Sequence, residues 1–263
     1  MIKGLRERFR YFKATGTTGI VAFIMSLLPD EKTCLDCIKA LEQGGCDVLE
    51  LGIPFSDPLA DGEMIEKFHH RGVEKGLNLD KGLEFAFKVK EIIHMPLVIF
   101  TYFNPVYQMG IENFRTRICE IGAEGVIVPD MPLEELERLT AKDIEVIPLV
   151  APSTPEARIK KADSLNPPFI YCVSVRGITG MQELPEEEIK DYLLRVRNNS
   201  ISPLALGFGI SSPEQARVFK DYTDALVVGS LLASVIEEYM SQPGRLPQEI
   251  ESMIRKFKKA VSC

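Results

Sequence analysis

Eight short apolar runs recur along the chain, and each is followed by a stretch in which apolar residues keep helical spacing. The runs cover residues 20–26, 48–53, 96–102, 125–128, 145–150, 169–173, 203–206 and 225–228. They are mostly continuous rather than alternating, as in parallel strands that helices cover on both faces. Eight strand-then-helix units in 263 residues predict an α/β protein, a (β/α)8 TIM barrel, in which residues 1–263 form a single barrel domain with an additional N-terminal helix.

The helices are expected between these runs. They are expected over 2–13, from 29–31 onward, over 63–73, 81–93, 111–121 and 133–140, from 154–156 onward, over 186–196, and from 212 and 229 onward, with a break at 243–244. Ser212-Pro213-Glu214-Gln215 combines an N-cap, a first-turn proline and a capping-box glutamine. An open doubly wound sheet is the alternative fold, but it requires a glycine-rich fingerprint after the first strand, where Ile24-Met25-Ser26-Leu27-Leu28 stands.

The charge and the N-terminal pattern limit the partners and the location. A net charge of −7 argues against a nucleic-acid partner, although local dipoles can still hold a phosphate. Basic residues before the apolar run 19–28 imitate a signal peptide, but Pro29-Asp30-Glu31-Lys32 stands in place of a cleavage site. The run is also shorter than the ~20 residues that span a bilayer. We therefore interpret it as the first buried strand and expect a cytoplasmic protein with no membrane partner.

The cysteines and histidines do not form a metal-binding pattern. Cys34 and Cys37 fall within a helical pattern with no second pair, so we expect free thiols in a reducing compartment. His69 and His70 are adjacent and diverge on a helix, and His94 stands alone. We expect no metal site. No lysine stands at the carboxyl end of a strand, which argues against a Schiff-base aldolase.

A carboxylate interrupts the second apolar run. Glu50 lies in the middle of residues 48–53, on the same strand face as Val48 and Gly52. A lone carboxylate on a buried strand is costly unless it is paired or functional, and burial raises its pKa toward the range of a general acid or base. Asp57 and Asp61 follow in the next loop, so three carboxylates gather at one strand end. The alternative is a core glutamate satisfied by backbone N–H groups and two ordinary turn aspartates.

Three glycine-bearing stretches stand after the sixth, seventh and eighth strands. They are residues 177–180, 207–209 and 229–230, where glycines let backbone N–H groups approach an anion and a helix begins at Gly229 or Ser230. Loops after the seventh and eighth strands recurrently bind phosphate in barrels of this kind. Aromatic residues stand at the same strand ends, which suits a flat apolar ring, although barrel packing explains any one of them: Phe23, Phe100, Tyr102, Tyr171 and Phe208.

These motifs together resemble the tryptophan synthase alpha subunit family. The segment Leu-Glu-Leu-Gly-Ile-Pro-Phe-Ser-Asp-Pro-Leu-Ala-Asp-Gly at 49–62 looks like the family signature. Gly-Ile-Thr-Gly at 177–180, Gly-Phe-Gly-Ile-Ser at 207–211 and Val-Gly-Ser at 228–230 match in order and spacing. The resemblance covers essentially the whole chain.

The resemblance implies cleavage of indole-3-glycerol phosphate to indole and glyceraldehyde 3-phosphate. It makes Glu50 the acid and base, and Asp61 the acceptor of the indole N–H. It assigns the phosphate to Gly180, Gly209, Gly229 and Ser230, and the indole to Phe23, Phe100, Tyr102, Tyr171 and Phe208. Thr179 would close over the site and contact Asp61, excluding water.

The resemblance also implies a partner, a beta subunit that carries pyridoxal phosphate (PLP) and receives the indole in an alpha2-beta2 heterotetramer. Pro54, Asp57, Asn104 and Pro132 match positions that face this partner. The cofactor belongs to the partner, so none is expected in this chain.

Some positions depart from the family pattern. Residues 25–29 replace a Gly-Asp-Pro turn, Glu63 and Glu66 replace a proline and a glutamine beside Asp61, and Arg176 replaces a small residue before a short loop, 181–185. The two added carboxylates are expected to disfavour the negative charge of Asp61 or to repel the substrate phosphate. They motivate a second hypothesis, an alpha subunit with weakened catalysis that acts mainly as an allosteric activator of the beta subunit.

Overall fold

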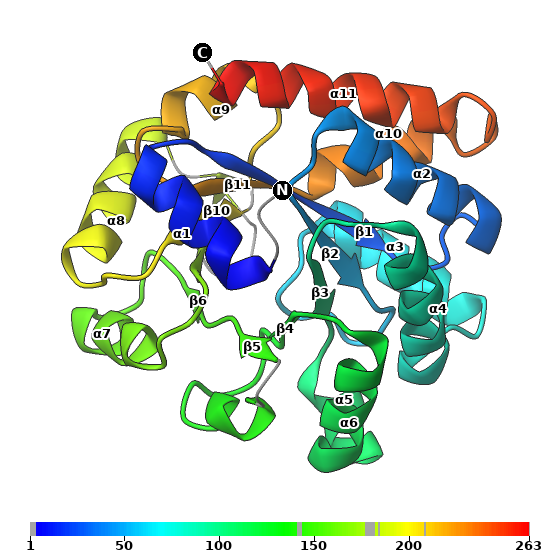
Figure 1. Ribbon diagram of the computed structural model, residues 1–263, viewed down its shortest axis with the longest axis horizontal. Helices are drawn as coiled ribbons and strands as arrows, with labels where there is room; N and C mark the ends of the chain where they lie inside the picture. Colours follow the sequence, from blue (N-terminus) through cyan, green and yellow to red (C-terminus); the bar gives the residue numbers. More distant parts are fainter. Residues whose placement is uncertain (1–3, 141–143, 177–181, 184, 208, 263) are drawn as a thin grey trace.

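Nine of the described strands form one parallel sheet that closes into a barrel, surrounded by helices (Figure 1), and β8 and β9 form a separate antiparallel pair. The computed structural model describes residues 4–140, 144–176, 182–183, 185–207 and 209–262. The strands are β1 (Gly19–Met25), β2 (Val48–Gly52), β3 (Leu97–Phe100), β4 (Gly125–Ile127), β5 (Glu145–Val146), β6 (Leu149–Val150), β7 (Ile170–Val173), β8 (Val175–Arg176), β9 (Gln182–Glu183), β10 (Leu204–Gly207) and β11 (Ala225–Val228). The (β/α)8 barrel expected from the sequence is confirmed.

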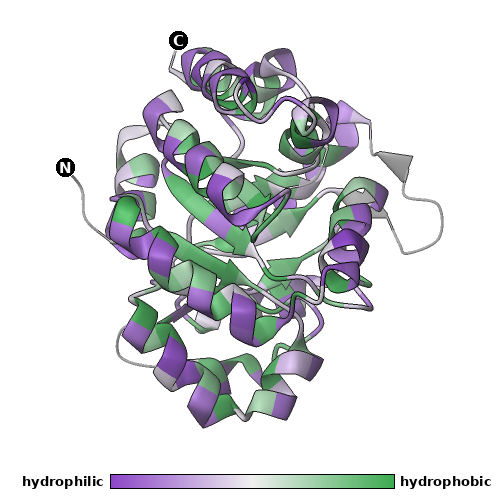
Figure 2. Ribbon diagram, turned by 90° about the vertical axis from the view of Figure 1, so that its right-hand side faces the viewer, coloured by the Kyte–Doolittle hydropathy of each residue, from purple (hydrophilic) through white to green (hydrophobic). Residues whose placement is uncertain are grey.

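The helices alternate with the strands along the chain. They are α1 (Leu5–Thr15), α2 (Glu31–Gly44), α3 (Glu63–Glu74), α4 (Leu79–Ile92), α5 (Phe103–Met109), α6 (Ile111–Ile121), the 3-10 helix η1 (Leu136–Leu139), α7 (Glu156–Ser164), α8 (Glu186–Asn198), α9 (Pro213–Phe219), α10 (Ser230–Tyr239) and α11 (Leu246–Val261). In Figure 2 the strands are largely hydrophobic, and the helices carry hydrophilic residues on the faces turned away from them. None of the helices in the described ranges is long and apolar enough to cross a membrane.

The barrel closes through a single interrupted strand. The sheet order is β5-β4-β3-β2-β1-β11-β10-β7-β6, so β5 and β6 stand at opposite ends of the order although only residues 147–148 separate them in the chain. The prediction of one continuous strand over 145–150 is therefore wrong in detail. Pro148 has no N–H to donate to a ladder. Its carbonyl nevertheless accepts the N–H of Tyr171 at 2.9 Å, so the hydrogen bonding between neighbouring strands continues past the interruption.

The expected helix over 133–140 is replaced by the short 3-10 helix η1. Leu133, Leu136 and Leu139 are all buried and recur every third residue. That spacing fits the three residues per turn of a 3-10 helix better than an α-helix. Helix α5 and the β8–β9 hairpin are absent from the sequence prediction, although Pro105 in the first turn of α5 is a helix-start signal.

Helix α1 covers the amino-terminal ends of the strands, as Figure 1 shows by its position across the barrel. Phe9 stacks on Phe169, the residue before β7, with 4.1 Å between ring centroids. The N–H of Leu5 donates to the carboxylate of Glu124, the residue before β4, at 2.8 Å. This end of the barrel is closed by packing, so a ligand enters at the other end.

Candidate active site

A cavity opens at the carboxyl ends of the strands. Residues from β1, β3, β7 and β11, from the loops after β2, β10 and β11, and from the first turns of α3 and α10 line it: Phe23, Asp61, Ile65, Phe100, Tyr171, Gly209, Ile210, Ser211, Val227, Gly229, Ser230 and Leu231. Seven of these twelve were predicted as site residues from the sequence. The fold therefore brings together groups that are far apart in the chain.

Glu50 lies in the barrel interior beside this cavity. It pairs in register with Phe23 of β1 on one side and Val98 of β3 on the other, so its side chain shares the inward face with the cavity-lining Phe23. The side chain is completely buried, and neither carboxylate oxygen has a hydrogen-bond partner among the described residues. Burial, with a smaller contribution from the charge of Asp61, raises the pKa of Glu50 to about 8. The alternative of a glutamate satisfied by backbone N–H groups does not fit this geometry.

Asp61 is held by a tyrosine. The Tyr102 hydroxyl donates to Asp61 Oδ2 at 2.5 Å and accepts the N–H of Ala60 at 3.2 Å. Burial, followed by the charge of Asp61, raises the pKa of Tyr102, so the phenol keeps its proton and remains a donor. Tyr102 is thus placed behind Asp61 and is absent from the cavity lining, whereas the sequence prediction assigned it to the indole.

His69, a residue without a predicted role, also lies against Asp61. Its Nε2 is 3.1 Å from Asp61 Oδ2, and its side chain is fully buried. The buried residues of α3 are Ile65, Phe68, His69 and Gly72, at positions i, i+3, i+4 and i+7. That spacing was present in the sequence and indicates an inward-facing His69.

Two glycines make room for the aromatic walls of the cavity. A Cβ on Gly52 would lie 2.4 Å from the Phe23 ring, and a Cβ on Gly207 would lie 2.3 Å from the Tyr171 hydroxyl. Any side chain at either position would displace the ring. Phe23 in turn meets Phe100 edge to face, with 5.4 Å between centroids. The rings are therefore fixed by the backbone, and Gly207 serves packing.

The lining of the cavity also presents backbone donors. Helix α10 begins at Ser230 after Gly229, and the first N–H groups of a helix have no partner within it. Gly209 has φ +85°, a left-handed conformation that favours glycine. These residues and Ser211 border one cavity, so the arrangement can hold an anion at the helix N-terminus.

Comparison with known proteins decides the family. The model of the family "Tryptophan synthase alpha chain" matches residues 9–262. The chain belongs to the tryptophan synthase alpha chain family. It is 54% identical over 254 residues to the tryptophan synthase alpha chain of Syntrophomonas wolfei, covering 97% of this chain and 98% of that one.

Solved structures of this family share the fold. The crystal structure of tryptophan synthase subunit alpha from Legionella pneumophila str. Paris has a TM-score of 0.89 at 25% identity and is covered over 99% of its length by 100% of this chain. A chain of the tryptophan synthase complex from Pyrococcus furiosus has a TM-score of 0.80 at 27% identity, with coverage of 92% of this chain and 97% of that chain.

Three of the site residues expected from the resemblance to the alpha chain family, Thr179, Gly180 and Phe208, lie outside the described residues. Of the expected partner-facing residues, Pro54 and Asn104 line one surface groove between the loop after β2 and helix α5. Asp57 is exposed in the same loop. Pro132 borders a separate hollow near η1.

Glu63 and Glu66, which depart from the alpha chain family pattern, face solvent. Both residues are exposed on α3, and Glu66 Oε1 lies 3.4 Å from the Nε2 of His70. Neither residue lines the cavity. The expected action of these carboxylates on Asp61 or on a phosphate therefore has no support in their placement, and the hypothesis of weakened catalysis is not favoured.

Proposed function

We propose that this chain cleaves indole-3-glycerol phosphate to indole and glyceraldehyde 3-phosphate. The observation that carries the proposal is Glu50, a fully buried carboxyl group without a hydrogen-bond partner among the described residues, beside the cavity at the carboxyl ends of the strands. Unsatisfied buried polar groups are rare in folded proteins and frequently act in catalysis. A pKa of about 8 keeps most of this group protonated near neutral pH, as a general acid requires.

The bond changes follow from the two carboxyl groups. Glu50 donates its proton to the indole ring carbon that bears the glycerol phosphate chain. The carboxylate so formed takes the proton of the adjacent hydroxyl as the carbon–carbon bond breaks, so glyceraldehyde 3-phosphate leaves as an aldehyde and Glu50 is protonated again. Asp61 accepts the ring N–H and stabilises the positive charge of the protonated ring. Two carboxyl groups in different environments thereby take two different roles.

The phosphate binds between the loops after β10 and β11 in this proposal. Backbone N–H groups at the start of α10 and the left-handed turn at Gly209 support it. The aromatic residues Phe23, Phe100 and Tyr171, which line the same cavity, suit the indole ring. By analogy with the family, Gly180, Thr179 and Phe208 would complete the site.

We propose further that a beta subunit binds the face formed by the loop after β2 and helix α5. Pro54 and Asn104 border its groove, and Leu59 and Tyr107, on the same two elements, are 70% and 68% exposed. Large exposed apolar side chains are typical of protein interfaces. In this proposal the partner carries PLP, the assembly is an alpha2-beta2 heterotetramer, and Asp57 and Pro132 also face the partner.

The test is the release of indole from indole-3-glycerol phosphate by the purified chain, with and without its beta subunit. Release that increases with the partner is expected, together with its loss in Glu50→Gln. Normal release by Glu50→Gln in the assembled complex contradicts the assignment of Glu50. No release by the wild-type chain, together with faster turnover of added indole and serine by the beta subunit, overturns the cleavage reaction and leaves an activator.

A further inference from the structure

His69 is the buried polar group that the proposed mechanism does not use. Its side chain is completely buried and meets the Tyr102 ring edge to face, with 5.7 Å between centroids. Its Nε2 faces Asp61 Oδ2 at 3.1 Å but has no aligned hydrogen bond among the described residues. A buried nitrogen without a partner, pointed at a catalytic carboxylate, requires an explanation.

The other ring nitrogen fixes the position of the proton. The backbone N–H of Phe55 donates to His69 Nδ1 at 3.0 Å, so Nδ1 is an acceptor and carries no hydrogen. In a neutral imidazole the hydrogen then stands on Nε2, whereas a charged ring would place a hydrogen on both nitrogens and disrupt the Phe55 contact. His69 thus directs an N–H group at Asp61.

Tyr102 and His69 face the same oxygen of Asp61. Within the described part of the chain, Tyr102 Oη donates to Oδ2 and His69 Nε2 faces Oδ2. Oδ1 is thereby left as the oxygen that can accept from a ligand. Two donors from different elements, the segment after β3 and helix α3, would fix the plane of the carboxylate more firmly than one can.

We propose that His69 is a positioning residue for Asp61. Its Nε2–H donates to Oδ2 when Asp61 turns to meet the ring N–H of the ligand, and the Phe55 N–H holds the imidazole in the tautomer that this requires. The inference rests on the proposed function, in which Asp61 accepts the indole N–H.

The test separates the two ring nitrogens. Asparagine at position 69 reaches the place of Nδ1 and keeps an acceptor for Phe55 but loses the donor to Asp61, whereas glutamine reaches the place of Nε2 and keeps that donor. His70→Asn is the matched control, because His70 is the next residue on α3 and its side chain is 53% exposed. The probes are indole and benzothiophene, which have similar shape but differ in the ring N–H. The chain contains no tryptophan, so the fluorescence of bound indole is measured directly.

We expect His69→Asn to weaken indole binding about tenfold, the effect of one lost buried hydrogen bond, and to change benzothiophene binding less than about twofold. His69→Gln restores much of the preference for indole, and His70→Asn changes neither ligand. An equal loss for both ligands in His69→Asn indicates a merely structural role and overturns the proposal. If His69→Asn does not fold, the binding of indole and benzothiophene is compared between His69→Gln and His69→Met. These two side chains are similar in length, and only glutamine has a donor.

The rate of indole release in the complex with the beta subunit distinguishes this inference from the proposed function. We expect kcat/KM of His69→Asn to fall about tenfold, in parallel with its indole affinity. A wild-type complex that releases no indole overturns the proposed function. A wild-type complex that releases indole, with an unchanged rate in His69→Asn, overturns the role of His69 alone.

Discussion

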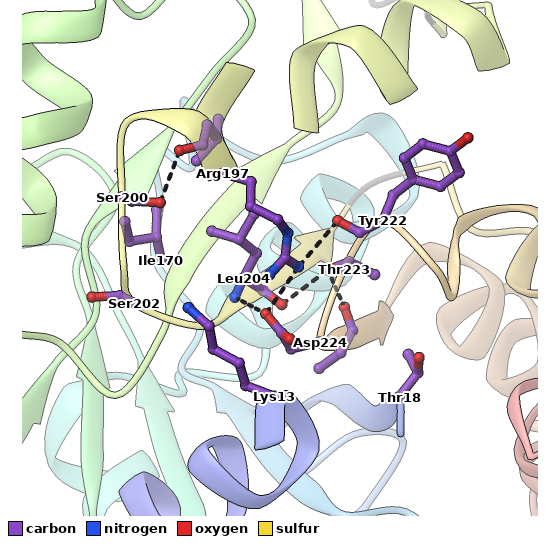
Figure 3. A network of polar contacts seen from close by, with 12 residues as sticks. Lys13, Thr18, Ile170, Arg197, Ser200, Ser202, Leu204, Tyr222, Thr223 and Asp224 are labelled. Atoms are coloured by element: carbon purple, nitrogen blue, oxygen red, sulfur yellow. Dashed lines mark hydrogen bonds and ion pairs between the residues drawn. The ribbon is translucent and has the colours of Figure 1, made fainter. Parts of the chain in front are cut away.

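Two buried carboxyl groups at opposite ends of the barrel differ in their partners. Glu50, near the carboxyl ends of the strands, has no hydrogen bond among the described residues. Asp224, just before β11 at the amino ends, is 6% exposed and has several. Its Oδ2 accepts the N–H of Leu204 at 2.7 Å and the guanidinium of Arg197 at 3.1 Å (Figure 3).

The neighbours of Asp224 are satisfied as well. Arg197 also donates to the carbonyl of Tyr222 at 3.3 Å, and the hydroxyl of Thr223 donates to the carbonyl of Leu204 at 2.9 Å (Figure 3). This network joins α8, β10 and the start of β11. A buried charge with several partners fits a structural role, whereas one without partners costs stability and is available for chemistry. In barrels of this kind the first belongs to the amino end and the second to the carboxyl end.

The largest expected effect is on catalysis at Glu50. Glu50→Gln keeps the shape of the side chain but removes the acid, so we expect kcat for indole release to fall on the order of a thousandfold. Circular dichroism and the melting temperature should be those of the wild type or higher, because no hydrogen bond is lost. A variant that melts earlier and retains its rate would reverse the roles of the two carboxyl groups.

Asp224→Ala should show the opposite pattern. It leaves the Arg197 guanidinium and the Leu204 N–H without their acceptor, and we expect a loss of about 3 kcal/mol in the free energy of unfolding. Urea denaturation measures this loss. Asp221→Ala, which removes an exposed aspartate three residues away, is the control and should change stability by less than about 0.5 kcal/mol. The kcat of the folded Asp224→Ala fraction should be unchanged, and a fall there would contradict a purely structural role.

The pH dependence of the free energy of unfolding tests the raised pKa of Glu50. The pKa of Glu50 is raised from 4.5 to about 8 in the folded protein, so between these values the native state binds more protons than the unfolded state. Stability therefore falls as pH rises through this window, by about 1.4 kcal/mol for each pH unit, and the loss is complete above pH 8.

Glu50→Gln lacks this group, so its free energy of unfolding should gain on the wild type from pH 5 to pH 8 and then keep a constant difference. Denaturation of both proteins at several pH values measures the difference. A difference that does not change with pH would mean that Glu50 is ionised in the folded protein at pH 5.

The fold followed from the sequence because its signals are local. Apolar runs and helical spacing occur within a few residues of one another, and they located all eight strand regions of the barrel. The errors arose where the spacing was misinterpreted, as with the leucines of η1, or where Pro148 was read through as part of a strand.

The site was harder to predict from the sequence, because its contacts join residues that are far apart in the chain. Tyr102 and Asp61 are 41 residues apart, and no periodicity indicates that one holds the other. The sequence also left two interpretations of Glu50 open, a satisfied core glutamate or a catalytic one. Only the folded chain shows that donors are absent around Glu50 among the described residues. The inward direction of His69 was visible in the spacing of α3, but its contact with Asp61 was not.

The smallest expected effect tests whether nearness in sequence to Asp61 matters. Glu63 and Glu66 are exposed and border none of the cavity, so water screens their charges from the substrate. The double variant Glu63→Gln, Glu66→Gln should change kcat and KM for indole-3-glycerol phosphate by less than about twofold, since exposed charges couple weakly. A clear fall in KM would show that these carboxylates repel the phosphate, and it would support a catalytic weakness in this chain. An unchanged KM would mean that burial and hydrogen bonding, rather than the number of carboxylates nearby, separate Glu50 and Asp61 from the other acidic residues of this region.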